Sequence, residues 1–132
     1  MFLNRLTPSE KKSFLMLSHH VAHVDGDFSD EELDMIRKYC MEMQMDEVSY
    51  DATTFNLTEI LSVFESDKSK KIALLEIMAL IYADGRVAKE EEELLSEMID
   101  RFELNPNLAI VYREWSKTIL SLFVQGEALI HL

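Results

Sequence analysis

Two short acidic segments of this chain combine the residue types that bind hard cations. In residues 25–32 and again in residues 84–91, an aspartate and a glycine are followed by an apolar residue and then by a glutamate. Carboxylate oxygens are ligands of calcium and magnesium, and this order matches the second half of a calcium-binding loop. The ligands of a divalent-cation site would be Asp25, Asp27, Asp30 and Glu31 in the first segment and Asp84 and Glu91 in the second.

The same segments also fit a structural interpretation. Neither is a regular EF-hand, because the positions of the earlier ligands hold Val21, His23, Leu80 and Tyr82. Gly26 and Gly85 would each end a helix, since glycine tolerates the left-handed conformation found there. Ser29 and Glu32 form a capping-box pattern, whereas Ala88 replaces the serine in the second segment. Helix capping and weak binding of calcium or magnesium are therefore both open.

Two histidines next to the first segment suggest a different metal. His19 and His23 are four residues apart, so they share one helix face, a spacing that suits zinc or copper. Asp27 or Glu31 would supply a third ligand from across the turn. No glutamate stands beside the first histidine in the HExxH order, so zinc-protease chemistry is not supported. Two surface or half-buried histidines without a metal are the alternative, and zinc is less favoured than calcium or magnesium.

The sequence contains no recognisable nucleophilic site. Cys40, its only cysteine, falls with Met43 on a predicted apolar helix face, where both would pack as core residues. No basic cluster lies nearby in sequence to lower the pKa of the thiol. The GxSxG, P-loop and GxGxxG patterns are absent. We expect a protein that is not an enzyme, and a metal-dependent enzyme with an acidic site is the least favoured alternative.

The elements that position these residues repeat along the chain. Residues 21–36 align without gaps on residues 80–95, matching the two Asp-Gly pairs. The copies extend over approximately 13–45 and 72–104, and each has an apolar run before its Asp-Gly and an acidic, helix-prone run after it. Two helical hairpins packed together would bury apolar faces that one hairpin cannot bury alone. Only three glycines and two prolines interrupt the chain, which also favours helices.

The periodicity predicts an all-α fold of about six to seven helices in a single domain, residues 1–132. We expect helices over 7–24, 29–45, 56–64, 66–83, 90–102 and 105–126, with a loop at 46–55 and Gly126 ending the last helix. The 66–83 helix is apolar around most of its circumference, which predicts the central, buried position. Glu76 would lie on its one exposed stripe, or else pair with His20 or a lysine. The inner face of the last helix would be Leu108, Val111, Trp115, Ile119 and Leu122.

Charge restricts the classes of partner. The net charge is −12, which repels phosphate backbones, so we expect no nucleic acid as a partner. Cations and basic protein surfaces are the natural partners of such a field. The single cysteine excludes an internal disulfide and fits a reducing compartment. The most apolar run, residues 72–83, is too short to cross a bilayer, so we expect no transmembrane segment.

The repeated motif resembles a known family. The pattern of an apolar residue, alanine, two variable residues, Asp-Gly, an apolar residue and a glutamate, set in a helix pair, is similar to that of the TerB-like family, which is associated with tellurite resistance. The second copy, ALIYADGRVAKEEEELLSEMIDRFEL, is the closer match, through residues 82–85 and Glu91. The first copy matches through Asp25-Gly26, Phe28, Ser29 and Glu32. The resemblance covers roughly Thr7 to Leu104.

The resemblance implies an all-α fold of about seven helices and a cytoplasmic protein, either free or peripheral to the inner membrane face. It also implies a stress-response role in which the protein binds a metal or a partner without catalysis. His19, His20 and His23 depart from the family pattern, which is mostly apolar or small there. Our expectation is a non-catalytic interaction or scaffold module of a tellurite, metal or envelope stress response. A divalent-cation-binding protein is the alternative.

Overall fold

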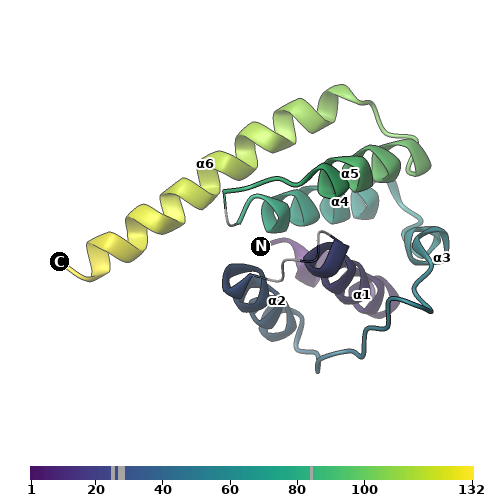
Figure 1. Cartoon of the computed structure of the whole chain (residues 1–132), viewed down its shortest axis with the longest axis horizontal. Helices are drawn as coiled ribbons and strands as arrows, with labels where there is room; N and C mark the ends of the chain where they lie inside the picture. Colours follow the sequence, from purple (N-terminus) through teal and green to yellow (C-terminus); the bar gives the residue numbers. More distant parts are fainter. Residues whose placement is uncertain (25, 27–28, 84) are drawn as a thin grey trace.

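The structure is a computed structural model that describes residues 1–24, 26, 29–83 and 85–132. Within those ranges the chain forms helices and no strands, so the all-α prediction is confirmed. The elements are a short 3-10 helix, η1 (Leu3–Arg5), and the helices α1 (Pro8–Val24), α2 (Asp30–Met43), α3 (Leu57–Ser62), α4 (Asp67–Ile81), α5 (Lys89–Arg101) and α6 (Asn107–Ile130) (Figure 1).

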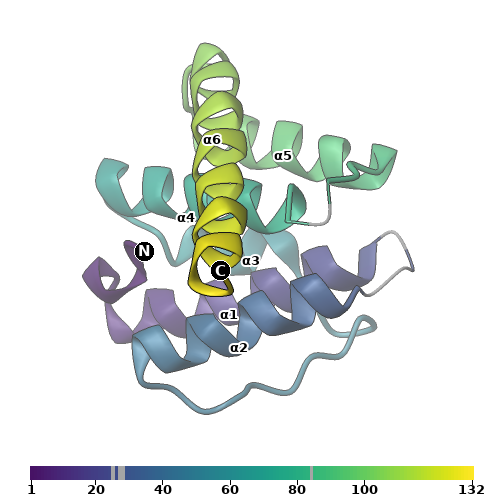
Figure 2. The same cartoon turned by 90° about the vertical axis from the view of Figure 1, so that its left-hand side faces the viewer.

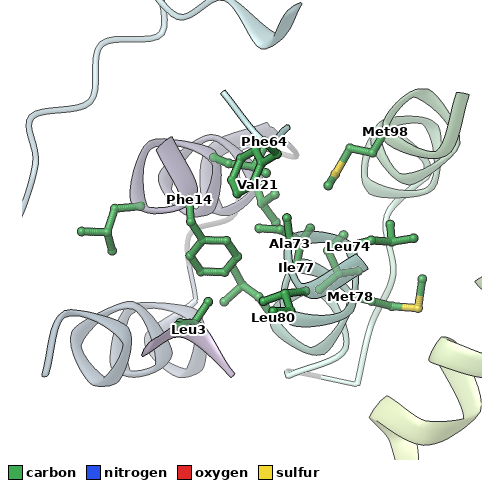
Figure 3. Close-up of a cluster of buried hydrophobic side chains, with 14 of the residues drawn as sticks. Leu3, Phe14, Val21, Phe64, Ala73, Leu74, Ile77, Met78, Leu80 and Met98 are labelled. Atoms are coloured by element: carbon green, nitrogen blue, oxygen red, sulfur yellow. The ribbon is translucent and has the colours of Figure 1, made fainter. Parts of the chain in front are cut away.

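Helix α4 lies at the centre of the molecule, as its apolar circumference predicted. It packs against α1 and α2 on one side and against α5 and α6 on the other (Figure 2). Ala73, Leu74 and Ile77 of α4 are completely buried; Ala73 and Ile77 lie on the side of Phe14 and Val21 of α1, and Leu74 lies on the side of Met98 of α5 (Figure 3). The buried apolar side chains from η1 through Leu104, apart from Ala79, form one cluster. This core holds the two helix pairs, α1 with α2 and α4 with α5, in place.

Side-chain caps define where most helices begin. The Thr7 hydroxyl accepts a hydrogen bond from the Glu10 N–H at 3.2 Å, and the Glu10 carboxylate accepts one from the Thr7 N–H at 2.9 Å. The side chains of Asn56 and Ser66 likewise accept a hydrogen bond from the N–H three residues on, at the starts of α3 and α4. Each cap satisfies a backbone donor that has no partner within its helix. The helix starts expected near residues 7, 56 and 66 therefore agree with the structure.

The prediction that Glu76 lies on an exposed stripe was wrong. Its side chain is only 4% exposed, and it accepts hydrogen bonds from the Met1 ammonium and the Phe2 N–H, each at 3.1 Å. The same ammonium lies 2.8 Å from Glu42. The suggested partner, His20, instead contacts the 44–56 loop. A buried carboxylate needs such partners, and here they come from a segment more than 70 positions away in the sequence.

The predicted inner face of α6 was right for Leu108, which packs against the core, but wrong for two of its other residues, and the predicted end of the helix was wrong. All of α6 is described, and Ser116 is its one buried residue. Val111 is 62% exposed and Leu122 is 53% exposed, although both were assigned to the core. The helix passes through Gly126 without interruption and continues to Ile130. Helical spacing identifies an apolar face but not what covers it, and the C-terminal half of α6 extends beyond the other helices (Figure 1).

Candidate functional site

The predicted cation ligands divide into three groups. Asp25, Asp27 and Asp84 lie outside the described residues, as does Phe28 of the motif. Asp30 and Glu31 are exposed in the first turn of α2. Glu91 is buried at the start of α5, where it is 3% exposed. The described ligands therefore occupy two environments, one open to solvent and one enclosed.

The buried glutamates of both motifs bind helix N-termini. Glu32 Oε1 accepts hydrogen bonds from the N–H and the hydroxyl of Ser29, at 3.3 and 3.0 Å, and the Ser29 hydroxyl accepts one from the Glu32 N–H at 3.1 Å. Glu91 Oε1 accepts one from the Ala88 N–H at 2.9 Å. This is the capping box predicted for α2, and α5 has the glutamate half of it without a side-chain cap. These contacts support the structural interpretation of the two glutamates.

The turns before these helices share one backbone feature. Gly26 and Gly85 both have φ of +76°, the left-handed region that glycine adopts most readily. Among the described residues, no three or more histidine, cysteine, aspartate or glutamate side chains are grouped so that they could hold a metal ion. Because three of the six proposed carboxylate ligands are outside that set, calcium or magnesium binding stays a prediction.

The histidines of α1 contact the 44–56 loop. The ring of His20 stacks on Phe55 with centroids 4.0 Å apart, and its Nδ1 lies 2.8 Å from the Tyr50 hydroxyl. Tyr50 also stacks against His23 at 5.1 Å. His23 Nδ1 donates a hydrogen bond to the carbonyl oxygen of His19 at 2.6 Å. The rings thus hold a loop against α1, and this arrangement differs from the convergence on one point that a zinc site needs.

Burial favours the neutral form of two of these histidines, His19 and His20, by lowering their pKa values. Burial lowers the pKa of His19; the charge of Glu47, whose Oε2 lies 3.7 Å from His19 Nε2, opposes that shift, and His23 adds to it. Burial also lowers the pKa of His20, with His23 adding to the shift and Glu97 opposing it. The residues of the loop were missed by the sequence analysis, because an irregular segment has no periodicity that reveals which helix it covers.

Cys40 lies beside the same loop. Burial raises the pKa of its thiol, and the Glu47 carboxylate, 3.7 Å from Sγ, raises it further. A thiol whose pKa is raised stays protonated at neutral pH and is a poor nucleophile. The side chain is buried in the core cluster, as predicted. This environment supports a packing role for Cys40.

The exposed acids form the second candidate site. Asp30, Glu31 and Asp34 are exposed on α2, and Glu90 and Glu93 are exposed on α5. Asp34 lies 3.7 Å from Arg37, and Glu93 lies 3.9 Å from Lys89. Exposed ion pairs of this length contribute little stability, so they leave these carboxylates available to a stronger partner.

Comparisons of this chain with protein-family models, with curated proteins and with solved structures give no match. None of the described helices is long and apolar enough to cross a membrane. A functional assignment therefore depends on the residues and their geometry.

Proposed function

We propose that this chain is a non-catalytic, TerB-like helical module that binds a basic surface of another protein through the acidic first turns of α2 and α5. The observation that carries the proposal is the exposure of Asp30 and Glu31 in one turn and of Glu90 in the other, while the neighbouring Glu32 and Glu91 are buried as caps. Each turn therefore presents carboxylates to solvent from a fixed helix start.

The physical reason for such a surface is electrostatic. A helix N-terminus carries a partial positive charge that stabilises acids in the first turn, so the carboxylates are held there at little cost. The net charge of −12 adds a long-range field that attracts a lysine- or arginine-rich surface. Complementary charge of this kind increases the association rate and discriminates between partners. A basic protein surface is the chemistry that fits these acids best.

A non-catalytic role agrees with the chemistry of the described residues. The pKa of Cys40 is raised, which disfavours a thiolate nucleophile. The carboxylates of Glu32 and Glu91 are used as helix caps. The stress-response setting of the proposal rests on the TerB-like motif alone, through residues such as Gly26 and Gly85. A scaffold that brings a partner to a metal or envelope stress response is the role that this resemblance implies.

The proposal is tested by capture of partner proteins on the immobilised chain at about 0.1 M and about 1 M salt, where the screening length is about 10 Å and 3 Å. We expect capture at the lower salt, loss at the higher salt, and loss at both in the Glu31→Gln/Glu90→Gln variant. The matched control is Glu59→Gln/Glu65→Gln, which removes the same charge from exposed positions elsewhere. Capture that survives the high salt and the double variant would overturn the proposal.

A further inference from the structure

The apolar face of α6 continues past the part of the helix that the core covers. Tyr112, Ser116, Ile119, Phe123 and Ile130 lie on one seam, with spacings of three, four and seven residues. Tyr112 packs on the core and Ser116 is fully buried. On the same seam, Phe123 is 58% exposed and Ile130 is 76% exposed. The seam is therefore partnered in its first half and open in its second, where α6 projects from the other helices (Figure 1).

A cavity of about 340 Å³ lies beneath this open half, between α6, α2 and α4. Its walls include Met35 and Tyr39 of α2, Ala79 of α4 and Phe123 of α6. The charged groups of the lining are Lys38, Glu127 and the Met1 ammonium with its partners Glu42 and Glu76. The walls are mostly apolar, so water in the cavity would be displaced favourably by apolar side chains. The open seam and the cavity together form one apolar surface.

The charge of α6 indicates which occupant fits this surface. Residues 119–132 contain one carboxylate, Glu127, and neither lysine nor arginine. Along these residues a basic protein would find a single acidic side chain, and an anionic membrane would find no lysine or arginine to bind. Two copies of this acidic chain repel each other over most of their surfaces, but not along this segment. A second copy of the same helix supplies the apolar, nearly uncharged face that the seam requires.

We infer that two copies of this chain pair antiparallel along the C-terminal half of α6. Antiparallel pairing with a two-fold axis places Phe123 of each copy opposite Gly126 of the other, and Ile119 opposite Ile130. A Cβ atom added at Gly126 would meet no atom within 4 Å, so the space above that glycine is open to an aromatic ring. This surface is separate from the acidic turns of the proposed function, so the inference does not depend on that function.

The apolar area of the segment is sufficient for a specific interface. Burial of a large apolar side chain removes about 60–120 Å² from water. Six such residues line the two edges and the seam of the open half: Ile119, Leu120, Leu122, Phe123, Leu129 and Ile130. Because Ile119 and Leu120 are already half-buried in the single chain, two copies together then bury roughly 600–1,200 Å², which brackets the ~1,000 Å² of a small specific interface. We expect a dimer with a dissociation constant of about micromolar order.

The test is the mass of the full chain by sedimentation equilibrium, from about 1 μM to about 1 mM. We expect a shift from the 15.4 kDa monomer to twice that mass over this range. Phe123→Asp should raise the dissociation constant roughly tenfold or more. Gly126→Leu should raise the dissociation constant similarly, because the new side chain fills the space that Phe123 of the other copy would occupy. Helix α6 of the monomer is not weakened by this change, since leucine has a higher helix propensity than glycine.

Val111→Asp is the matched control, because Val111 is as exposed as Phe123 but lies off the seam. It should leave the dimer intact, and circular dichroism should show unchanged helix content in all three variants. A chain that stays monomeric to about 1 mM would overturn the inference. The inference would also be overturned by a dimer whose dissociation constant is the same in the parent, in Phe123→Asp and in Gly126→Leu. A monomer that instead binds neutral phosphatidylcholine vesicles through Phe123 would overturn it in favour of a lipid occupant.

Discussion

Ser29 and Ala88 are equivalent positions at which the two acidic segments differ in capping chemistry. Their backbones are nearly identical, with φ −79° and ψ 156° at Ser29 and φ −76° and ψ 157° at Ala88. Only Ser29 supplies a side-chain oxygen to the N–H of the third helical residue. The buried glutamate of the box is present in both. The start of α5 is therefore a half-capped version of the start of α2.

This difference predicts opposite effects of two substitutions. Ala88→Ser should increase the free energy of unfolding by about 0.5–2 kcal/mol, since the backbone is already in the capping conformation. Ser29→Ala should decrease it by a similar amount. Urea unfolding monitored by circular dichroism measures both, with Ala52→Ser, in an exposed turn, as the control. An Ala88→Ser variant no more stable than the parent would show that Glu91 alone satisfies the start of α5.

Glu76 is a residue whose burial could not be predicted from the neighbouring sequence. An acid inside an apolar run signals either an exposed stripe or a buried pair, and the local pattern does not distinguish them. The structure pairs it with the Met1 ammonium, whose pKa is raised by the charges and hydrogen bonds of Glu42 and Glu76, although burial opposes the shift. That contact joins distant segments, so no spacing rule predicts it.

At the scale of the elements, the burial of His19 and His20 between α1 and the 44–56 loop makes the stability of the chain depend on pH. The pKa values of His19 and His20 are lowered by burial and by His23, against the opposing charges of Glu47 and Glu97. The unfolded chain, with histidine pKa values near 6.5, binds more protons than the folded chain as the pH falls below that value. The contribution of these two histidines to the free energy of unfolding is complete above pH 6.5. It is lost as the pH falls toward their lowered pKa values in the folded chain.

The expected result is a urea midpoint that falls as the pH is lowered from above 6.5. The His20→Gln variant should show a smaller fall, because one of the groups is removed. His131→Gln, at an exposed histidine near the end of α6, serves as the control and should keep the slope of the parent. Equal slopes in the parent and in His20→Gln would contradict the assignment.

The two acidic segments also allow a test of cation binding. The proposed function needs no bound cation, and Glu91, one of the six proposed ligands, caps a helix, so we expect no increase in melting temperature on addition of millimolar calcium or magnesium. A ligand that binds only the folded chain would raise that temperature. An increase that disappears in the Asp25→Asn/Asp27→Asn/Glu31→Gln variant would instead establish the cation-binding alternative.

Helix starts were predictable because their chemistry is local. Ser29 with Glu32, and Thr7 with Glu10, are each three residues apart, so the sequence alone brings the groups together. The outer half of α6 was not predictable in this way. Its spacing gives an amphipathic helix, yet whether the core reaches Leu122 depends on the lengths of the other helices. The same limit applies to Tyr50, whose place against α1 depends on the path of the loop.

For the whole molecule, charge and exposed apolar area occupy different surfaces. The 25 acidic residues give a field suited to a basic partner, whereas residues 119–132 contribute only one of them. Of the exposed large apolar residues, most lie on α6, from Ile110 to Ile130. The surface for pairing with a second copy and the surface for a basic protein are therefore separate. The two associations should respond differently to salt, since screening weakens the charged contact and leaves the apolar one.

The most direct test of the proposed function is the affinity of a captured partner, measured by calorimetry at about 0.1 M and about 1 M salt. Binding should weaken by at least about tenfold at the higher salt. Glu31→Gln/Glu90→Gln should weaken it similarly at the lower salt, and Glu59→Gln/Glu65→Gln should not. An affinity that neither salt nor the Glu31→Gln/Glu90→Gln variant changes would contradict the claim that the acidic turns of α2 and α5 form the binding surface.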